Sequence, residues 1–154
     1  MVGTIPRLSP EWSMKFVFKV PSLPDDNRYA TIVHLSIGGS IAQRGDRTPV
    51  VQLLGREGKM SLIVASTIND HLNFIYSSKD DIVLNVSQPY SLEVHQRYLK
   101  NGLYRFFVIL DHVEIFSVVN RRAEQFYGVK VWACAPWSNP SLAEISNFEH
   151  TNFL

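Results

Sequence analysis

Three side chains that can form hydrogen bonds or ion pairs alternate along one segment: Glu93, His95 and Arg97. In an extended strand every second side chain lies on the same face, so these three would share one polar surface. Arg97 can donate two parallel hydrogen bonds to hydroxyls or to a carboxylate. Asn101-Gly102 predicts a tight hairpin that would bring Arg105 beside this surface. The face is interpreted either as a binding patch or as an ordinary solvated strand surface.

Three more residues offer polar or stacking contacts. His34 alternates with apolar neighbours in a predicted strand, and a neutral imidazole there can donate or accept a hydrogen bond. Trp137 follows Pro136 in a predicted loop, where an indole can stack on an apolar ligand face or pack over the end of the core. Asn139 adds an amide to the same loop. The alternative for His34 is a half-exposed sheet residue without a ligand.

A possible adhesion motif, Arg44-Gly45-Asp46, lies in the loop that follows Gly38-Gly39. Integrin-type adhesion requires an exposed tight loop that presents a cation and a carboxylate. A three-residue match often arises by chance, so a solvated loop without this function is the competing interpretation.

The bulk composition restricts the partners. The chain has 154 residues, 45% of them hydrophobic, and its 15 Lys and Arg nearly balance its 14 Asp and Glu. We therefore expect one domain over residues 1–154, with residues 1–10 as a flexible or edge-strand segment. A net charge of +1 predicts no nucleic-acid partner, and the apolar runs are too short for membrane insertion. Cys134 is the single cysteine, which excludes an internal disulfide, and no signal peptide is visible.

Alternating hydrophobicity predicts about ten short strands and no long helix. The only helical candidate, residues 121–126, also reads as a loop. Asp111-His112 would form a two-residue turn in which both residues take positive φ. The pattern predicts an all-β sandwich of two antiparallel sheets around one core. The predicted strands are 14–20, 29–37, 50–54, 59–66, 72–77, 90–98, 104–110, 113–119, 128–134 and 142–148.

A family resemblance begins at Tyr90. The stretch "YSLEVHQRYLKNGLYRFFVILDHVEIFSVVNRRAEQFYGVKVWACAPW", followed by "AEISNF", resembles the concanavalin-A-like lectin and laminin-G domains, which include galectins and pentraxins. The resemblance implies a concanavalin-A-like jelly roll and favours an extracellular or secreted location. The galectin motif is not reproduced, because His34 stands without its Asn and Arg partners. No calcium-site or other metal-ligand set stands out, so no metal and no cofactor are expected.

The resemblance implies a carbohydrate-binding, lectin-like module with glycan or glycoprotein partners. Its site would require that the candidate residues line one face: His34, His95, Arg97, Arg105, Trp137 and Asn139. Weak sugar sites gain from multivalency, so a homo-oligomer is expected. The alternative is a protein-interaction or cell-adhesion module with a protein receptor. We expect no enzymatic activity and no catalytic residue, because Asp111 and Glu114, the nearest match to a glucanase carboxylate motif, flank a turn and would not share a strand face.

Overall fold

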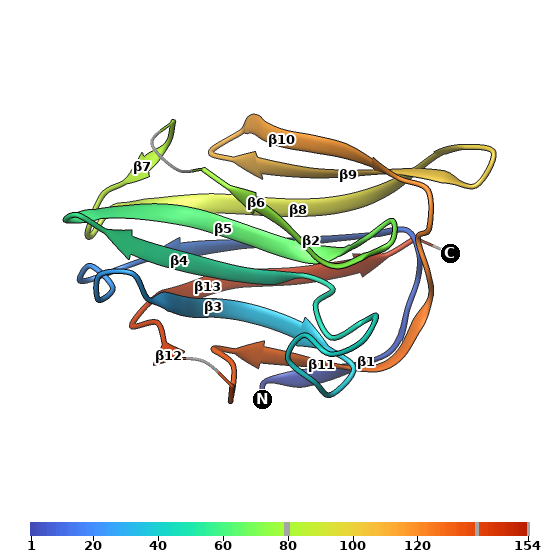
Figure 1. Ribbon diagram of the computed structural model, residues 1–154, viewed down its shortest axis with the longest axis horizontal. Helices are drawn as coiled ribbons and strands as arrows, with labels where there is room; N and C mark the ends of the chain where they lie inside the picture. Colours follow the sequence, from blue (N-terminus) through green and yellow to red (C-terminus); the bar gives the residue numbers. More distant parts are fainter. Residues whose placement is uncertain (79–80, 138, 154) are drawn as a thin grey trace.

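The computed structural model describes residues 1–78, 81–137 and 139–153, and it describes residues 139 and 140 by their backbone alone. Within these ranges the chain forms two antiparallel sheets that pack face to face (Figure 1). The larger sheet has the order β1-β11-β3-β4-β5-β6, and the smaller has the order β10-β9-β8-β2-β13. This arrangement confirms the predicted two-sheet sandwich.

The bounds of the strands follow the predicted ones closely. The larger sheet contains β1 (Gly3–Leu8), β3 (Tyr29–Ser36), β4 (Val50–Arg56), β5 (Lys59–Ile68), β6 (His71–Ser77) and β11 (Phe126–Ala133), with β7 (Val83–Leu84) paired to β5 and β12 (Asn139–Pro140) paired to β3. The smaller sheet contains β2 (Trp12–Lys19), β8 (Pro89–Lys100), β9 (Leu103–Leu110), β10 (Val113–Asn120) and β13 (Glu144–Asn152). The two-residue strands β7 and β12 were not predicted, because two residues carry no readable alternation.

Two hairpin turns agree with their sequence signals. Asp111 and His112 have φ of 47° and 67°, as a two-residue turn of this handedness requires. Asn101 and Gly102 also have positive φ, 52° and 73°, in the hairpin between β8 and β9. Residues 121–126 form a bend that leads into β11, and the described part of the chain contains no helix. It therefore contains no helix that is long and apolar enough to cross a membrane.

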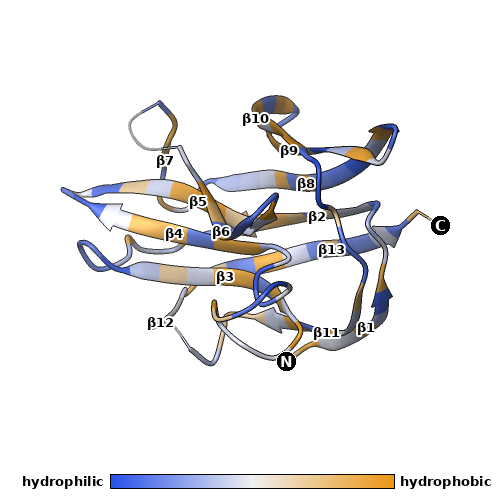
Figure 2. Ribbon diagram, turned by 45° about the vertical axis from the view of Figure 1, so that its right-hand side comes forward, coloured by the Kyte–Doolittle hydropathy of each residue, from blue (hydrophilic) through white to orange (hydrophobic). Residues whose placement is uncertain are grey.

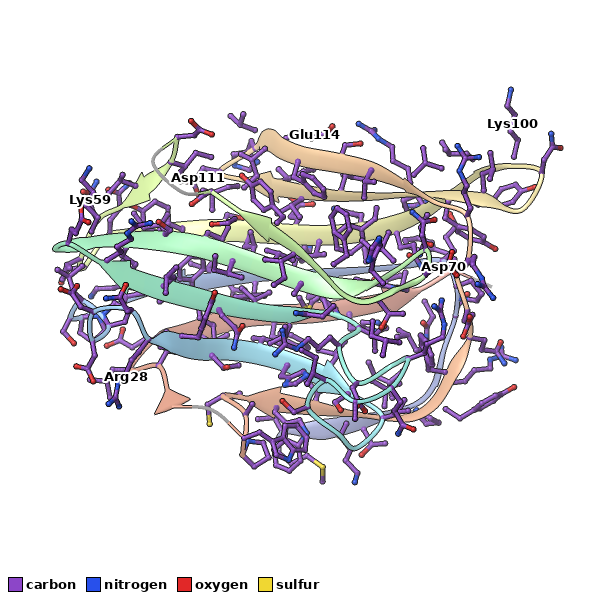
Figure 3. All side chains as sticks on the ribbon, viewed as in Figure 1. Arg28, Lys59, Asp70, Lys100, Asp111 and Glu114 are labelled. Carbon is purple, nitrogen blue, oxygen red and sulfur yellow. The ribbon has the colours of Figure 1, made fainter. Side chains whose placement is uncertain are left out.

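One hydrophobic core fills the space between the sheets. Strand β2 shows the reason, because Trp12, Met14, Phe16 and Phe18 alternate with more exposed residues and are at most 2% exposed. Ring contacts within this core are dense, and Trp12 meets Phe106 of β9 edge to face. Apolar residues alternate with polar ones along the strands in Figure 2. In Figure 3 the charged side chains of Lys59 and Lys100 lie at the two ends of the sandwich.

The edges of the two sheets do not coincide. On one side β11 and β1 extend beyond β13, which is the edge strand of the smaller sheet (Figures 1 and 2). The inner faces of β1 and β11 are therefore only partly covered by the opposite sheet.

The imidazole of His150 makes stability depend on pH. His150 stacks on Trp12 with ring centroids 6.4 Å apart, and burial lowers the pKa of its ring from 6.5 to about 4. Between these values the unfolded chain binds a proton that the folded chain does not, so the free energy of unfolding must fall as the pH falls. His150→Phe keeps a ring on Trp12 and removes this effect.

As the pH falls through this range, we expect the free energy of unfolding of the unaltered protein to decrease by about 1–2 kcal/mol more than that of the His150→Phe variant. This value is reduced because His150 is partly exposed to solvent. Urea unfolding of both proteins at several pH values measures the difference. Burial also lowers the pKa of His34, but that residue is present in both proteins and cancels. Parallel pH profiles for the two proteins would contradict the assignment to His150.

Candidate functional site

A groove of about 350 Å³ lies on the outer face of the larger sheet. Its floor comes from β3 to β6, and its walls come from the loop before β4 and the segment after β11. Val50, Gln52 and Ile63 of the floor are buried but do not belong to the central core, whereas Ile75 on β6 is 47% exposed. The polar and aromatic side chains that line the groove are Tyr29, Thr31, His34, Ser40, Arg47, Gln52, Asn73 and Trp137.

Arg47 is the positive charge in this groove. Its Nε donates to the carbonyl of Ser40 at 3.1 Å, and its Nη1 donates to Asn73 Oδ1 at 2.5 Å. Within the described ranges no carboxylate forms an ion pair with it and no group accepts from its Nη2. Burial lowers the pKa of the Arg47 guanidinium, although it remains charged at neutral pH. A partly desolvated cation without a counter-ion favours the binding of an anion.

Two amides stand beside this cation. Gln52 is 6% exposed, and its Nε2 donates to Thr31 Oγ1 at 3.0 Å. Asn73 uses Oδ1 to hold Arg47. In the described part of the chain no hydrogen bond reaches Gln52 Oε1 or leaves Asn73 Nδ2. The groove therefore offers an acceptor, a donor and half of a guanidinium fork to a polar ligand.

His34 contributes a neutral imidazole. Its Nε2 lies 2.6 Å from the carbonyl oxygen of Asp46, and because a carbonyl only accepts, Nε2 must carry the proton. Burial lowers the pKa of His34, and the charge of Arg47 lowers it further. The ring is therefore neutral at pH 7, and Nδ1 holds the lone pair that can accept a hydrogen bond.

Asp46 holds the wall of the groove in place. Its Oδ1 accepts from the Gly39 amide and its Oδ2 from the Gln43 amide, each at 3.0 Å. A side chain on Gly39 would come within 2.5 Å of the Asp46 carboxylate, so only glycine fits there. These contacts fix the loop that carries Arg47, the next residue in the chain.

Two aromatic side chains border the groove and reach solvent. Trp137 is 42% exposed and packs edge to face on His34, with centroids 5.5 Å apart. It also contacts Trp132 edge to face at 6.0 Å. Tyr29 is 45% exposed at the start of β3, and its phenol interacts electrostatically with Arg47. Partly exposed aromatics held by other rings are suited to stacking on the apolar face of a sugar.

The candidate residues do not converge on one face. His34 and Trp137 meet in the groove, whereas His95, Arg97 and Arg105 lie on the outer face of the smaller sheet, with the core between the two groups. These five candidate residues therefore lie on two different faces and do not form one site. The cause is topological, because β3 and β8 belong to different sheets.

The three residues on the smaller sheet are already paired with the protein itself. His95 Nε2 lies 2.9 Å from Glu93 Oε2, and its ring stacks on Phe107. Arg97 bonds Glu11 at 2.8 Å and packs over the Phe153 ring. Arg105 bonds Glu114 and also donates to Ser117 at 2.9 Å. This face resembles the solvated strand surface of the alternative interpretation more than an unsatisfied binding patch.

The adhesion loop is not presented to solvent. The side chain of Asp46 is 0% exposed, and both of its oxygens accept backbone hydrogen bonds. Arg44 is held by the carbonyls of Asn69 and Arg122 and by Glu124. Gly45 packs against Phe126. The tripeptide therefore stabilises the loop and offers no free carboxylate to a receptor.

Of the polar and aromatic residues in the groove, only His34 and Trp137 were predicted from the sequence; Tyr29, Thr31, Ser40, Arg47, Gln52 and Asn73 were not. Gln52 carried a usable signal, because it is the one polar residue in the apolar run Val50–Leu54. Arg47 directly follows the adhesion tripeptide and carries no signal of its own in the local sequence. The side chain of Asn139, a predicted contact, lies outside the described residues. Within the described ranges, no three His, Cys, Asp or Glu side chains gather as metal ligands.

Comparison with solved structures confirms the fold. The heptameric SAP-like pentraxin from Limulus polyphemus matches 97% of this chain with a TM-score of 0.61 and 14% identity. The alginate lyase Aly36B, in complex with alginate tetrasaccharide, matches 97% with a TM-score of 0.64 and 13% identity. The alginate lyase PA1167 from Pseudomonas aeruginosa matches 93% with a TM-score of 0.57 and 15% identity. The chain is a concanavalin-A-like jelly roll, as the sequence resemblance implied.

This chain spans 66%, 72% and 65% of those three proteins. No protein-family model matches its sequence, and no curated protein matches it. Identities of this size establish the fold and not the activity. The matched structures nevertheless correct one expectation. The sequence predicted no enzymatic activity, but several matched proteins of this fold are alginate lyases, so the fold does not exclude an enzyme.

Proposed function

We propose that this protein binds an acidic polysaccharide in the groove on the outer face of the larger sheet. The observation that carries the proposal is Arg47, a partly buried guanidinium whose Nη2 has no partner in the described part of the chain. A carboxylated sugar would supply the missing anion. The amides of Gln52 and Asn73 and the ring of Trp137 would contact its hydroxyls and its apolar face.

The groove belongs to a domain that we expect to act as a single binding unit. We propose that residues 1–154 bind as one lectin-like domain and that glycans or glycoproteins are its partners. Several matched proteins of this fold are alginate lyases, and one of them is in complex with alginate tetrasaccharide, which supports an acidic glycan. One groove of this size would hold a glycan weakly. A homo-oligomer would present several such grooves and would therefore bind the glycan more tightly through avidity.

The test is a binding titration with matched glycans. Calorimetry would compare oligomannuronate with a neutral mannose oligomer of equal length. We expect the acidic chain to bind at least about tenfold more tightly, and added salt to reduce this preference because a charge pair is screened. Equal affinity for both oligomers, or binding to neither, would refute an acidic ligand in this groove.

A second candidate function is cleavage of the same ligand by β-elimination. One observation favours it: Tyr29 and the neutral His34 lie in the groove with Arg47. In such a reaction a cation stabilises the carboxylate, a base removes the proton from the carbon next to it, and the glycosidic oxygen leaves with a proton from an acid. Each cleavage creates a double bond conjugated to the carboxylate, which absorbs ultraviolet light.

The elimination assay uses oligomannuronate, oligoguluronate and polygalacturonate. A rise in ultraviolet absorbance that Tyr29→Phe abolishes would assign an acid or base role to the phenol. If the purified protein binds these chains and the absorbance stays constant, the protein is a binder of the polymer and not a lyase for it.

A further inference from the structure

A second hollow, of about 430 Å³, opens between the edges of the two sheets. One wall is the inner face of β13, from which Ile145, Phe148 and His150 line the space. The opposite wall belongs to β1, β3 and β11, including Ile5 and Val131. Because β11 and β1 extend beyond β13 (Figure 1), the smaller sheet does not close this side.

The sequence creates the hollow at two points. Gly3 pairs with Val131 in the β1–β11 ladder, so the two residues share one face, and Gly3 contributes no side chain to it. A Cβ placed on Gly3 would meet no atom within 4 Å. On the other wall, a bulge in β13 between Ser146 and Glu149 interrupts the ladder with β2. A bulge re-aims side chains, and it accounts for Ile145 and Phe148, three residues apart, both lining the hollow.

The side chains that line the hollow determine which kind of ligand it can bind. It contains no charged side chain, and most of its residues are aliphatic or aromatic. Phe148 is 36% exposed, although it packs against Phe16 of the core. Among the described residues neither ring nitrogen of His150 has a hydrogen-bond partner, and Nε2 is buried as well. A buried polar atom without a partner is costly, and a ligand group can satisfy it.

We propose that this hollow binds a small apolar molecule that carries one neutral hydrogen-bonding group. The apolar body would lie between Phe148 and the wall around Gly3 and Val131, and the polar group would meet the ring of His150. A hollow of this volume is within the range of ordinary small-molecule sites. A charged group is disfavoured, because no lining side chain would compensate for its lost hydration.

The experiment uses naphthol and naphthoate as probes. They share one ring system, and at neutral pH they differ in that the hydroxyl is neutral and the carboxylate is charged. Resonances of Val131 and Ile145 methyl groups and of the His150 ring would be followed by NMR during each titration. We expect naphthol to shift these signals with a submillimolar Kd and naphthoate to bind at least about tenfold more weakly.

Two variants locate the site. Gly3→Phe adds an aromatic ring at a position where a Cβ would meet no atom within 4 Å, and it should weaken the binding of naphthol at least about tenfold. His150→Phe keeps the shape and removes the polar partner, and about a fivefold loss is expected. Val113→Phe adds the same ring to β10, an edge strand on the opposite side, and should change nothing. Thermal unfolding of each variant shows whether the fold is intact.

Three results would overturn the proposal. Naphthol affinity that Gly3→Phe leaves unchanged would place the probe elsewhere. If naphthoate binds as tightly as naphthol, the hollow does not prefer a neutral polar group over a charged one. Self-association of the protein that Gly3→Phe abolishes would mean that a second copy of the chain fills the hollow.

Discussion

Replacing Arg47 with alanine is expected to weaken the binding of an oligouronate by roughly 30- to 100-fold, since hydrogen bonds to a charged group contribute about 1.5–3 kcal/mol each. The variant removes the cation of the groove, and it also leaves Asn73 Oδ1 without its 2.5 Å donor. Binding of a neutral oligosaccharide should change much less. Calorimetry with the two ligands separates the loss of charge from a general disturbance of the groove.

The controls for Arg47 come from the chain itself. Arg105→Ala removes an arginine of comparable partial exposure from the outer face of the opposite sheet, where it pairs with Glu114, and it should not affect binding. Arg47→Lys keeps the charge but loses the fork, so an intermediate affinity is expected. If Arg105→Ala weakens binding as much as Arg47→Ala, the ligand binds the smaller sheet and the proposed groove is wrong.

Replacing Asp46 with alanine is expected to lower the free energy of unfolding by about 3 kcal/mol. The carboxylate is fully buried and accepts from the amides of Gly39 and Gln43. Its removal leaves two donors unsatisfied and opens a void beneath the loop, and each lost charge-assisted bond costs about 1.5 kcal/mol or more. Urea unfolding at neutral pH measures the change. Because Arg47 follows directly in the chain, affinity for the oligouronate should fall together with stability.

Asp46→Asn tests whether the loop needs the charge or only the shape. The amide keeps one acceptor oxygen but places an NH₂ opposite a backbone donor, so we expect about half of the loss. The adhesion hypothesis predicts the reverse pattern: a receptor-binding carboxylate would be exposed, and its loss would abolish cell attachment without affecting stability. Full stability of Asp46→Ala would contradict the buried role described above.

The sequence predicted the part of the site that depends on residue type. Trp137 stood out because an indole that follows a proline in a loop can stack on a ligand or pack over the end of the core, and His34 stood out as a polar residue within an apolar strand. His95 and Arg97, which alternate on β8, and Arg105 on β9 were interpreted either as a binding patch or as a solvated strand face, and their spacing did not separate the two. Arg97 and Arg105 pair with Glu11 and Glu114, which lie outside their own strands, and such pairing is not visible in local spacing, whereas Glu93 lies only two residues from His95.

The sequence by itself determined the scaffold. Period-two alternation and the turns at Asn101-Gly102 and Asp111-His112 specify a sandwich of two antiparallel sheets, because each signal is local and reports which face of a strand is buried. The resemblance that begins at Tyr90 implied the jelly roll. Only the tertiary structure decided where a ligand could bind. Gln52 and Asn73 come together through the pairing of β4, β5 and β6. Arg47 reaches them from the loop before β4 and donates to Asn73, and the carboxylate beside it in the chain, Asp46, accepts from backbone amides instead. A register between strands and the absence of a counter-charge are properties of the assembled sheet, and no single stretch of the chain contains them.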